Sequence, residues 1–282
     1  MSTGVLLVSC PDRPGLVSAF ANFIHQNNGN IYCSDNHTDH EKKLFLSRIE
    51  WELDGFKIPR DKIESEFAKV GEPLGATWKF KFTEDVPNIS VWASIQDHCL
   101  YDIILRQKSK EFKANIPLII SNHAKVQRVA EHFGIDFVYL PITHINKQDQ
   151  EAKQLELLKK YKINLVILAK YMQVLSPEFL EKAPTTINIH HSFLPAFPGA
   201  DPYAQAYARG VKVIGATAHY VNSELDAGPI ISQDVIDVTH RQTVADLKRD
   251  GKDIERIVLG RAVRWHLHHK VLTYENRTVV FE

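Results

Sequence analysis

Two polar side chains share one face of a predicted strand near its end. In the segment Ile-Asn-Ile-His at 187–190, strand alternation places Asn188 and His190 on one face and the two isoleucines on the other. The strand ends before the loop 195–199 (Pro-Ala-Phe-Pro-Gly), where open α/β sheets place their ligand crevice. An amide and an imidazole at that point can donate hydrogen bonds to a ligand or a reacting group. The alternative is a buried histidine with one satisfied nitrogen.

An acidic residue before a glycine–proline break is the second candidate. Asp226 precedes Gly228-Pro229 and an apolar strand that begins at Ile230. Its carboxylate could serve a ligand, or it could build the turn by accepting hydrogen bonds from the next backbone amides. The two motifs together, Asn-Ile-His-x-Ser-x-Leu-Pro followed by Leu-Asp-x-Gly-Pro, resemble the formyltransferase family. Enzymes of that family handle the formyl group of 10-formyltetrahydrofolate.

A third segment, 168–176, is similar to the folate-binding segment of that family. The resemblance implies that the folate is bound by one set of side chains: Met172, Gln173, Val174, Leu175, Asn222 and Leu225. A strand end followed by the helix cap Ser176-Pro177 is an equally good interpretation of the same segment, and the two are compatible. Lys170 departs from the arginine expected in many relatives and keeps the charge.

The loop after the predicted strand 89–93 decides which acceptor of the formyl group we expect. In the related transformylases that loop is glycine-rich and lets backbone amides approach an acceptor phosphate. Here the loop 94–100 contains no glycine, and Asp97 would repel a phosphate. We therefore predict that water is the acceptor, and we place Ser94, Asp97, His98 and His191 on the acceptor side.

The resemblance is then to the deformylase branch of the family, which hydrolyses 10-formyltetrahydrofolate to formate and tetrahydrofolate. It implies that the formate supplies purine synthesis and that the reaction balances the one-carbon pool. Two alternatives stay open. One is a transferase of the same fold with an amine acceptor, and the other is a catalytically inactive regulator that binds folate or an amino acid.

The resemblance also implies roles for the three candidate residues. The Asn188 amide and the His190 imidazole stabilise the oxyanion, an assignment that their shared face also suits. Asp226 holds the water, orients His190 and assists proton transfer to the leaving nitrogen. No metal or cofactor is expected. The histidines 266, 268 and 269 could suggest a metal site, but cationic side chains at the end of a predicted helix over 252–269 are the simpler explanation.

The elements that position these residues form a predicted catalytic domain over residues 89–282. Short apolar strands at 89–93, 116–120, 137–140, 165–169 and 186–190 alternate with helices at 122–133 and 149–161. This alternation predicts an α/β fold with a mostly parallel, doubly wound sheet. Residues 84–88, which are acidic and contain a proline, are the predicted linker before it.

Residues 1–83 read as a separate βαββαβ domain of ferredoxin-like type. The strands are predicted at 5–8, 31–40, 44–51 and 78–82, with one helix from residue 16 and another over 62–70. With its Pro-Asp-Arg-Pro-Gly turn, this segment resembles the ACT regulatory domain. The resemblance implies an amino-acid effector near Asp12, Gly15 and Leu16 and a homo-oligomer, whereas a simple tight turn explains the same residues.

Composition limits the class of partner. The 282 residues contain 34 Lys plus Arg and 34 Asp plus Glu, so no net charge attracts nucleic acid or a membrane surface, and a small-molecule partner is expected. The chain lacks both a signal-peptide pattern and an apolar run long enough for a bilayer, and its three cysteines are too few for a disulfide framework. A cytoplasmic protein is the expectation.

Overall fold

A computed structural model of the chain describes residues 2–196 and 201–282, so the predicted loop 195–199 lies outside the described residues from residue 197 on. The chain forms two compact units. The first comprises Met1–Val86, His268–Tyr274 and Val279–Glu282, and the second comprises Pro87–Leu267 and Glu275–Thr278. The first change of unit falls within the predicted linker 84–88. The prediction assigned every later residue to the second domain, whereas 268–274 and 279–282 pack in the first unit.

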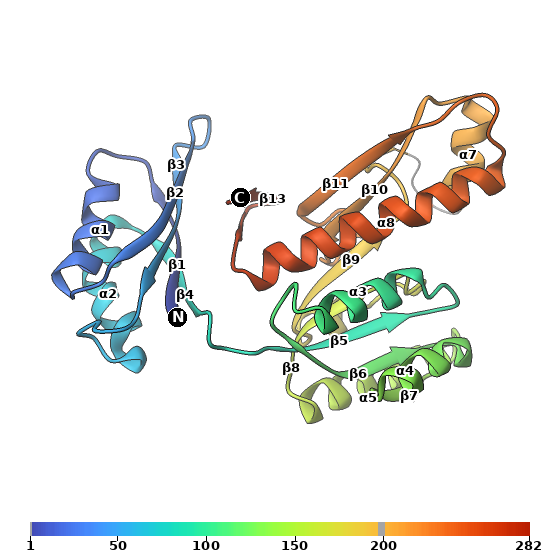
Figure 1. Cartoon of the computed structure of the whole chain (residues 1–282), viewed down its shortest axis with the longest axis horizontal. Helices are drawn as coiled ribbons and strands as arrows, with labels where there is room; N and C mark the ends of the chain where they lie inside the picture. The colour runs from blue at the N-terminus through green and yellow to red at the C-terminus, as the bar shows by residue number, and fades with distance from the viewer. Residues whose placement is uncertain (1, 197–200) are drawn as a thin grey trace. The chain divides into compact units, whose positions relative to one another are not determined.

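The first unit has the predicted βαββαβ order (Figure 1). Its elements are β1 (Thr3–Pro11), α1 (Leu16–Gln26), β2 (Ile31–Asp39), β3 (Leu44–Glu52), a 3-10 turn (Arg60–Lys62), α2 (Ile63–Gly71), a second 3-10 turn (Glu72–Leu74) and β4 (Thr77–Phe82). Within the described ranges, the four strands form an antiparallel sheet in the order β2-β3-β1-β4.

Both faces of the central strand β1 are buried. Leu6 and Val8 pack with Phe20 of α1 and Phe67 of α2 on one face. Val5 and Leu7 pack on the other face in a cluster whose remaining buried members are Leu46, Leu272 and Phe281. A strand that is buried on both faces reads as a continuous apolar run, which explains the sequence Val-Leu-Leu-Val at 5–8.

The second unit is built around a larger sheet (Figure 1). Its elements are β5 (Asn88–Ala93), α3 (His98–Lys108), β6 (Asn115–Ser121), a 3-10 turn (Ala124–Val126), α4 (Gln127–Phe133), β7 (Asp136–Tyr139), α5 (Lys147–Lys160), β8 (Ile163–Leu168), α6 (Pro177–Leu180), β9 (Thr185–His190), α7 (Pro202–Arg209), β10 (Val213–Tyr220), β11 (Ile230–Asp237) and α8 (Val244–Leu267). A terminal pair of strands, β12 (Val271–Tyr274) and β13 (Arg277–Val280), completes the described chain.

Among the described residues this sheet has seven strands in the order β11-β10-β9-β8-β5-β6-β7. The strands β5 to β9 pair in parallel, and β10 pairs antiparallel with both β9 and β11, so the sheet is mostly parallel, as predicted. Leu158 of α5 and Phe179 of α6 pack with Trp92 of β5 in one core cluster. A separate set of helices, α3, α4 and α8, is joined by contacts of α3 with α8 and of Tyr101 with Phe133.

Two helix predictions differ from the structure. The helix predicted over 122–133 begins with the 3-10 turn and becomes α-helical only at Gln127. The helix predicted over 252–269 begins at Val244 and ends at Leu267, so His268 and His269 lie beyond it. Gly251 therefore lies inside α8, where it is a packing residue: a Cβ there would lie 2.1 Å from the Tyr203 hydroxyl of α7.

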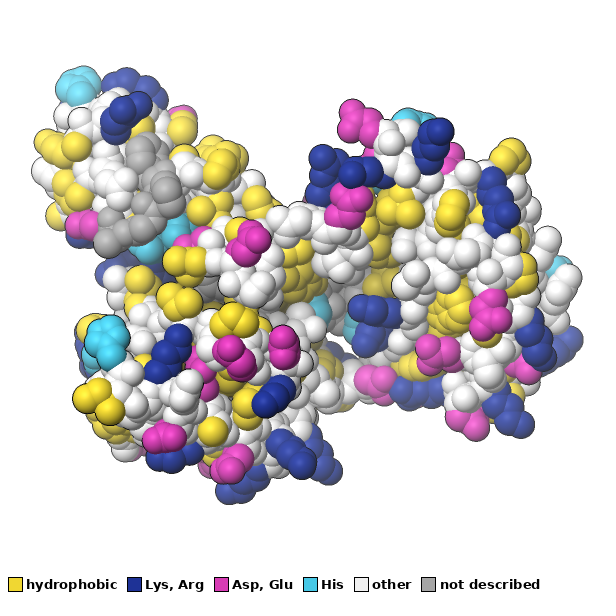
Figure 2. Space-filling model, turned by 180° about the vertical axis from the view of Figure 1, so that it is seen from behind, with side chains coloured by type: hydrophobic (Ala, Val, Ile, Leu, Met, Phe, Trp, Pro, Cys, Tyr) yellow, Lys and Arg dark blue, Asp and Glu magenta, His cyan; other side chains and the backbone are white. Residues whose placement is uncertain are grey.

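The surface carries charges of both signs. On the face drawn in Figure 2, lysine and arginine side chains are interspersed with aspartate and glutamate, in keeping with the balanced composition. No helix in the described part of the chain is both long enough and apolar enough to span a bilayer.

Candidate active site

A cavity of about 300 Å³ in the second unit gathers the residues singled out in the sequence. Its lining includes all three predicted catalytic residues, Asn188, His190 and Asp226. It also includes the complete predicted folate-binding set, Met172, Gln173, Val174, Leu175, Asn222 and Leu225. Its volume lies at the lower end of the range of small-molecule sites.

The catalytic candidates are held by a network of hydrogen bonds. His190 ends β9, is 5% exposed, and places Nδ1 3.2 Å from Oδ2 of Asp226. Asn188 lies two residues earlier on the same face, and its Nδ2 is 3.2 Å from Nε2 of His219. The hydrogen bond from His190, and then the interaction with the nearby His219 imidazole, hold the pKa of Asp226 well below its ordinary value, although burial opposes the shift. Asp226 is therefore a carboxylate at neutral pH.

The remaining ring nitrogen of His190 is the unusual feature of this network. Nε2 is buried and has no hydrogen-bond partner within the part of the chain that the structure describes. An unpaired buried polar atom costs free energy, so such atoms in native proteins call for a functional or solvent explanation. A ligand atom in the cavity is the natural partner.

His219 belongs to the same network but was not predicted as a site residue. It lies on β10, opposite Asn188 in the antiparallel register, and its Nε2 is 3.7 Å from Oδ1 of Asp226. Its Nδ1 donates to the Tyr220 carbonyl at 2.9 Å, which leaves Nε2 to accept from the Asn188 amide. The sequence signal was the pair Thr217 and His219, polar residues on one face of an apolar strand, but only the register shows which partner each one meets.

A close approach of backbone segments brings Asp226 to His190. The loop leaves β10 at Tyr220, which pairs with Ile187, and returns so that the Tyr220 amide donates to the Pro229 carbonyl at 2.9 Å. A Cβ on Gly228 would lie 1.8 Å from the Tyr220 carbonyl oxygen, so only glycine fits there. Asp226 itself has a φ of 54°, in the left-handed region that aspartate and asparagine tolerate better than most residues.

The cavity wall formed by the predicted folate-binding residues presents apolar side chains to solvent. Met172, Val174 and Leu225 are 60%, 54% and 68% exposed, although each is a residue that usually avoids water. Below them, Ser176 caps α6 by accepting from the Phe179 amide, as predicted, and the buried carboxylate of Glu151 accepts from both the amide and the hydroxyl of Ser176. The cap thus anchors the end of the apolar loop.

The four residues predicted on the acceptor side are not equivalent. His191 lines the cavity, whereas Ser94, Asp97 and His98 do not. Ser94 is buried and supports the segment 168–176 of the predicted folate site, because its hydroxyl accepts from the Met172 amide and donates to Asn122. The other two are held by ion pairs, Asp97 with Arg128 and His98 with Glu255.

A second cavity of about 270 Å³ shares Lys170, Met172 and His191 with the first. Its other lining residues are mostly polar or charged and include Gln96, Asp201, Tyr203, Lys248 and Glu255. The two cavities therefore share three wall residues, and one has an apolar rim whereas the other is lined mostly by polar residues.

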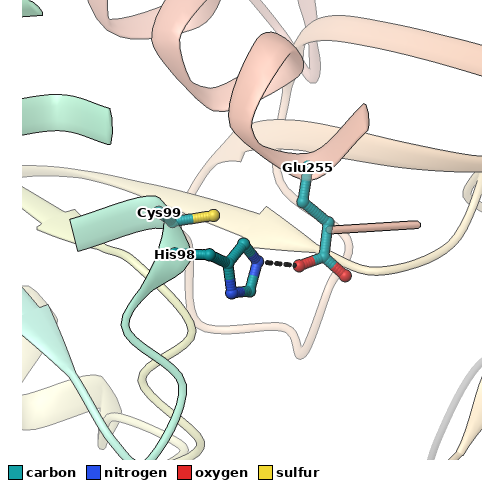
Figure 3. A group of neighbouring side chains, drawn as sticks. All are labelled: His98, Cys99 and Glu255. Carbon is teal, nitrogen blue, oxygen red and sulfur yellow. Dashed lines mark hydrogen bonds and ion pairs between the residues drawn. The ribbon is translucent and has the colours of Figure 1, made fainter. Parts of the chain in front are cut away.

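One cluster has the spacing of metal ligands: His98, Cys99 and Glu255 (Figure 3). Its carboxylate is already satisfied, because Glu255 accepts from His98 at 2.6 Å, from Tyr203 at 2.8 Å and from the Lys170 ammonium at 3.2 Å. Burial, and then the charge of Glu255, raise the pKa of the Cys99 thiol well above its ordinary value, so the thiol stays protonated. The adjacent ammonium and the protonated thiol both oppose a cation, and the donor set fits a hydrogen-bonded network better.

The histidines 266, 268 and 269 do not gather into a ligand set within the described ranges. His266 pairs through Nδ1 with the Tyr220 hydroxyl at 2.8 Å. The backbone carbonyls of His268 and His269 accept from the buried Arg48 side chain of the first unit. The helix-end explanation holds for His266 alone.

Known proteins resemble the chain both in part and over its whole length. A family model described as "Formyl transferase" matches residues 87–263. The formyltetrahydrofolate deformylase of Synechocystis sp. is 56% identical over 99% of this chain and 98% of its own length. The crystal structure of a formyltetrahydrofolate deformylase from Pseudomonas syringae pv. tomato superposes with a TM-score of 0.96 at 40% identity, covering 100% of this chain and 95% of that one.

A more distant solved structure matches only part of the chain. It is glycinamide ribonucleotide transformylase 1 from Symbiobacterium toebii, with a TM-score of 0.66 at 30% identity over 70% of this chain and 95% of its own. The similarity to the deformylases thus extends over nearly the whole chain, whereas the similarity to the transformylase covers 70% of it. The chain belongs to the formyl transferase family, and within it to the formyltetrahydrofolate deformylases.

Proposed function

We propose that this chain hydrolyses 10-formyltetrahydrofolate to formate and tetrahydrofolate. The observation that carries the proposal is the network of Asn188, His190 and Asp226 around one cavity with an apolar rim. Relatives named formyltetrahydrofolate deformylase, 38% to 56% identical over nearly the whole chain, support it. The reaction needs only the folate substrate and water.

In the proposed mechanism, the formyl oxygen receives hydrogen bonds from Asn188 Nδ2 and from His190 Nε2. His190 acts there as an imidazolium, because its Nδ1 already donates to Asp226 and a neutral ring has only one N–H. His190 Nε2 is buried without a hydrogen-bond partner among the described residues, which supports this role, because a substrate oxygen would supply that partner. Asn188 has two amide hydrogens, of which one faces His219, so the second is available for substrate. Donors held in place before the reaction stabilise the negative charge that develops on the oxygen, and losing one typically costs ~10²–10³ in turnover.

Asp226 has three tasks in this mechanism. Its carboxylate orients His190 through Nδ1, accepts a hydrogen bond from the attacking water and passes a proton toward the leaving nitrogen. The water oxygen bonds to the formyl carbon while the bond from that carbon to the nitrogen breaks. One water proton ends on the leaving nitrogen, and the second leaves with formic acid, which ionises in solvent.

The folate is proposed to lie against the exposed apolar residues Met172, Val174 and Leu225, with Gln173, Leu175 and Asn222 completing the wall. Covering these side chains with the pterin would remove apolar surface from water, at ~25 cal/mol per Å². The Ser94 and Ser176 contacts hold the loop in place before substrate arrives.

The first unit is proposed to be an ACT-type regulatory domain that assembles the chain into a homo-oligomer and takes an amino-acid effector at the turn after β1. Gly15 in that turn has a φ of 93°, Asp12 donates its amide to the Lys43 carbonyl, and Leu16 is buried. Calorimetric titration with the common amino acids tests the effector, and sedimentation tests the assembly. By resemblance, the compartment is the cytoplasm and the formate supplies purine synthesis.

The direct test of the activity is incubation of the full chain with 10-formyltetrahydrofolate and no added acceptor. We expect formate and tetrahydrofolate in equal amounts. Release only after an amine is added would favour a transferase, and folate binding without release under any condition would favour an inactive regulator.

A further inference from the structure

His191 lines both cavities, together with Lys170 and Met172. The first carries the proposed folate surface and the catalytic network. The second is polar, with a volume of about 270 Å³ that can hold several waters. A molecule in the second cavity can therefore contact the histidine that also borders the cavity of the catalytic network.

The acidic groups of the second cavity are already paired. Glu255 is 1% exposed and accepts from the Lys170 ammonium at 3.2 Å and from the Tyr203 hydroxyl at 2.8 Å. Asp201 lies 3.1 Å from the Lys248 ammonium. A charged ammonium group buried here would need an unpaired carboxylate, and the described lining offers neither acid in that state. Water, which is neutral and both donates and accepts, suits this cavity better.

His191 is the exception in this paired environment. Its ring centroid lies 5.0 Å from that of His190 and 6.0 Å from that of Tyr203, but no described residue forms a hydrogen bond with it. Burial, and then the electrostatic effects of Lys170 and His190, lower the pKa of His191 to about 4. The ring is therefore neutral at neutral pH and has one nitrogen lone pair to offer. The titratable groups that face it are Lys170, His190, Tyr203, Asp226 and Glu255.

The backbone after His191 is held firmly. The Thr217 hydroxyl of β10 donates to the Ser192 carbonyl at 2.8 Å and accepts from the Leu194 amide at 3.0 Å. The Gln233 amide of β11 donates to the same hydroxyl at 2.9 Å. These contacts fix the turn in which strand alternation ends, so His191 can face the cavities although it follows His190 directly.

We propose that the attacking water enters through the second cavity and donates a hydrogen bond to the neutral ring of His191. This inference rests on the proposed hydrolysis and adds a residue to it. A water that donates one hydrogen to Asp226 and the other to His191 has a lone pair left to face the formyl carbon. The proton balance is unchanged: one proton reaches the leaving nitrogen and the other departs with formic acid.

The test compares two variants of the full chain. His191→Phe keeps an aromatic ring against His190 and Tyr203 but has no acceptor nitrogen, so it separates packing from hydrogen bonding. His191→Ala removes the ring and leaves space for added imidazole. His144→Ala, at an exposed loop position, is the matched control.

We expect His191→Phe to lose ~10²–10³ in kcat with little change in KM, and to keep its affinity for tetrahydrofolate. His191→Ala should show a similar loss that imidazole partly restores, while imidazole should not help His191→Phe. A His191→Phe variant within about fivefold of the wild-type kcat would overturn the inference, as would an alanine variant that imidazole leaves unrestored. If the wild-type chain itself releases no formate, the proposed function fails instead, so the two failures are distinguishable.

Discussion

Replacing Asp226 by asparagine changes the active site with the least disturbance of the backbone. At a φ of 54°, asparagine takes the left-handed conformation as readily as aspartate, whereas alanine would add ~1–2 kcal/mol of strain. The amide also keeps nearly the same shape between His190 and His219. A loss of activity in Asp226→Asn therefore reports on the charge and the proton, and not on the path of the loop.

The expected loss follows from the contacts of the carboxylate. Its hydrogen bond to His190 at 3.2 Å orients an oxyanion donor, and misplacing such a donor costs ~10²–10³. Removing its role in proton transfer costs ~10²–10⁴. Because groups that act as a unit are not additive, we expect kcat to fall by ~10³–10⁴, or about 4–5.5 kcal/mol in the barrier.

The assay follows formate and tetrahydrofolate release under saturating substrate. Asp237→Asn, an exposed position on β11, is the control and should match wild type. Binding of tetrahydrofolate and the melting temperature show whether the variant is folded. A folded Asp226→Asn variant with near-normal kcat would remove Asp226 from the chemistry and refute the reasoning.

Three further predictions address the loop, the buried network and the folate surface. Gly228→Ala should cost ~1–3 kcal/mol of stability and most of the activity, measured by denaturation and turnover, because its Cβ meets the Tyr220 carbonyl. Glu255→Gln should destabilise the chain by ~3–5 kcal/mol by leaving the Lys170 ammonium without its counter-charge. Although burial opposes it, the hydrogen bond from His98 and the charge of Lys170 lower the pKa of Glu255 to about 2. Its carboxylate therefore contributes stability that is complete above pH ~4.5 and is lost as pH falls toward 2, which acid denaturation of wild type against Glu255→Gln would show. Leu225→Ala should raise KM about tenfold with kcat largely kept, since it removes exposed apolar surface and no catalytic group.

The parts of the fold that the sequence predicts are those with strong local signals. The parallel strands β5 to β9 are short apolar runs separated by helices, and the βαββαβ order of the first unit follows from turns rich in proline and glycine. Where the signal depends on a distant partner, prediction fails. The helix predicted from residue 252 begins at Val244, and Gly251 packs inside it against Tyr203 of α7. Residues after 267 look like the end of the second domain until Leu272 and Phe281 are seen against Val5.

The site residues also divide into those that a local sequence pattern predicts and those that depend on a distant partner. Strand alternation correctly pairs Asn188 with His190, since a period of two is a local property. His219 joins them only through the register of β10 against β9, which no local pattern encodes. Likewise, Ser94 and His98 are polar residues near a strand end, where a ligand site is expected, but Asn122 and Glu255 take up their hydrogen bonds inside the protein.

The central claim is that water is the formyl acceptor, and oxygen-18 water tests it most directly. Formate released by the full chain from 10-formyltetrahydrofolate should carry one solvent oxygen per molecule, in step with tetrahydrofolate formed. Tetrahydrofolate formed without labelled formate, or with the formyl group on another molecule, would contradict hydrolysis.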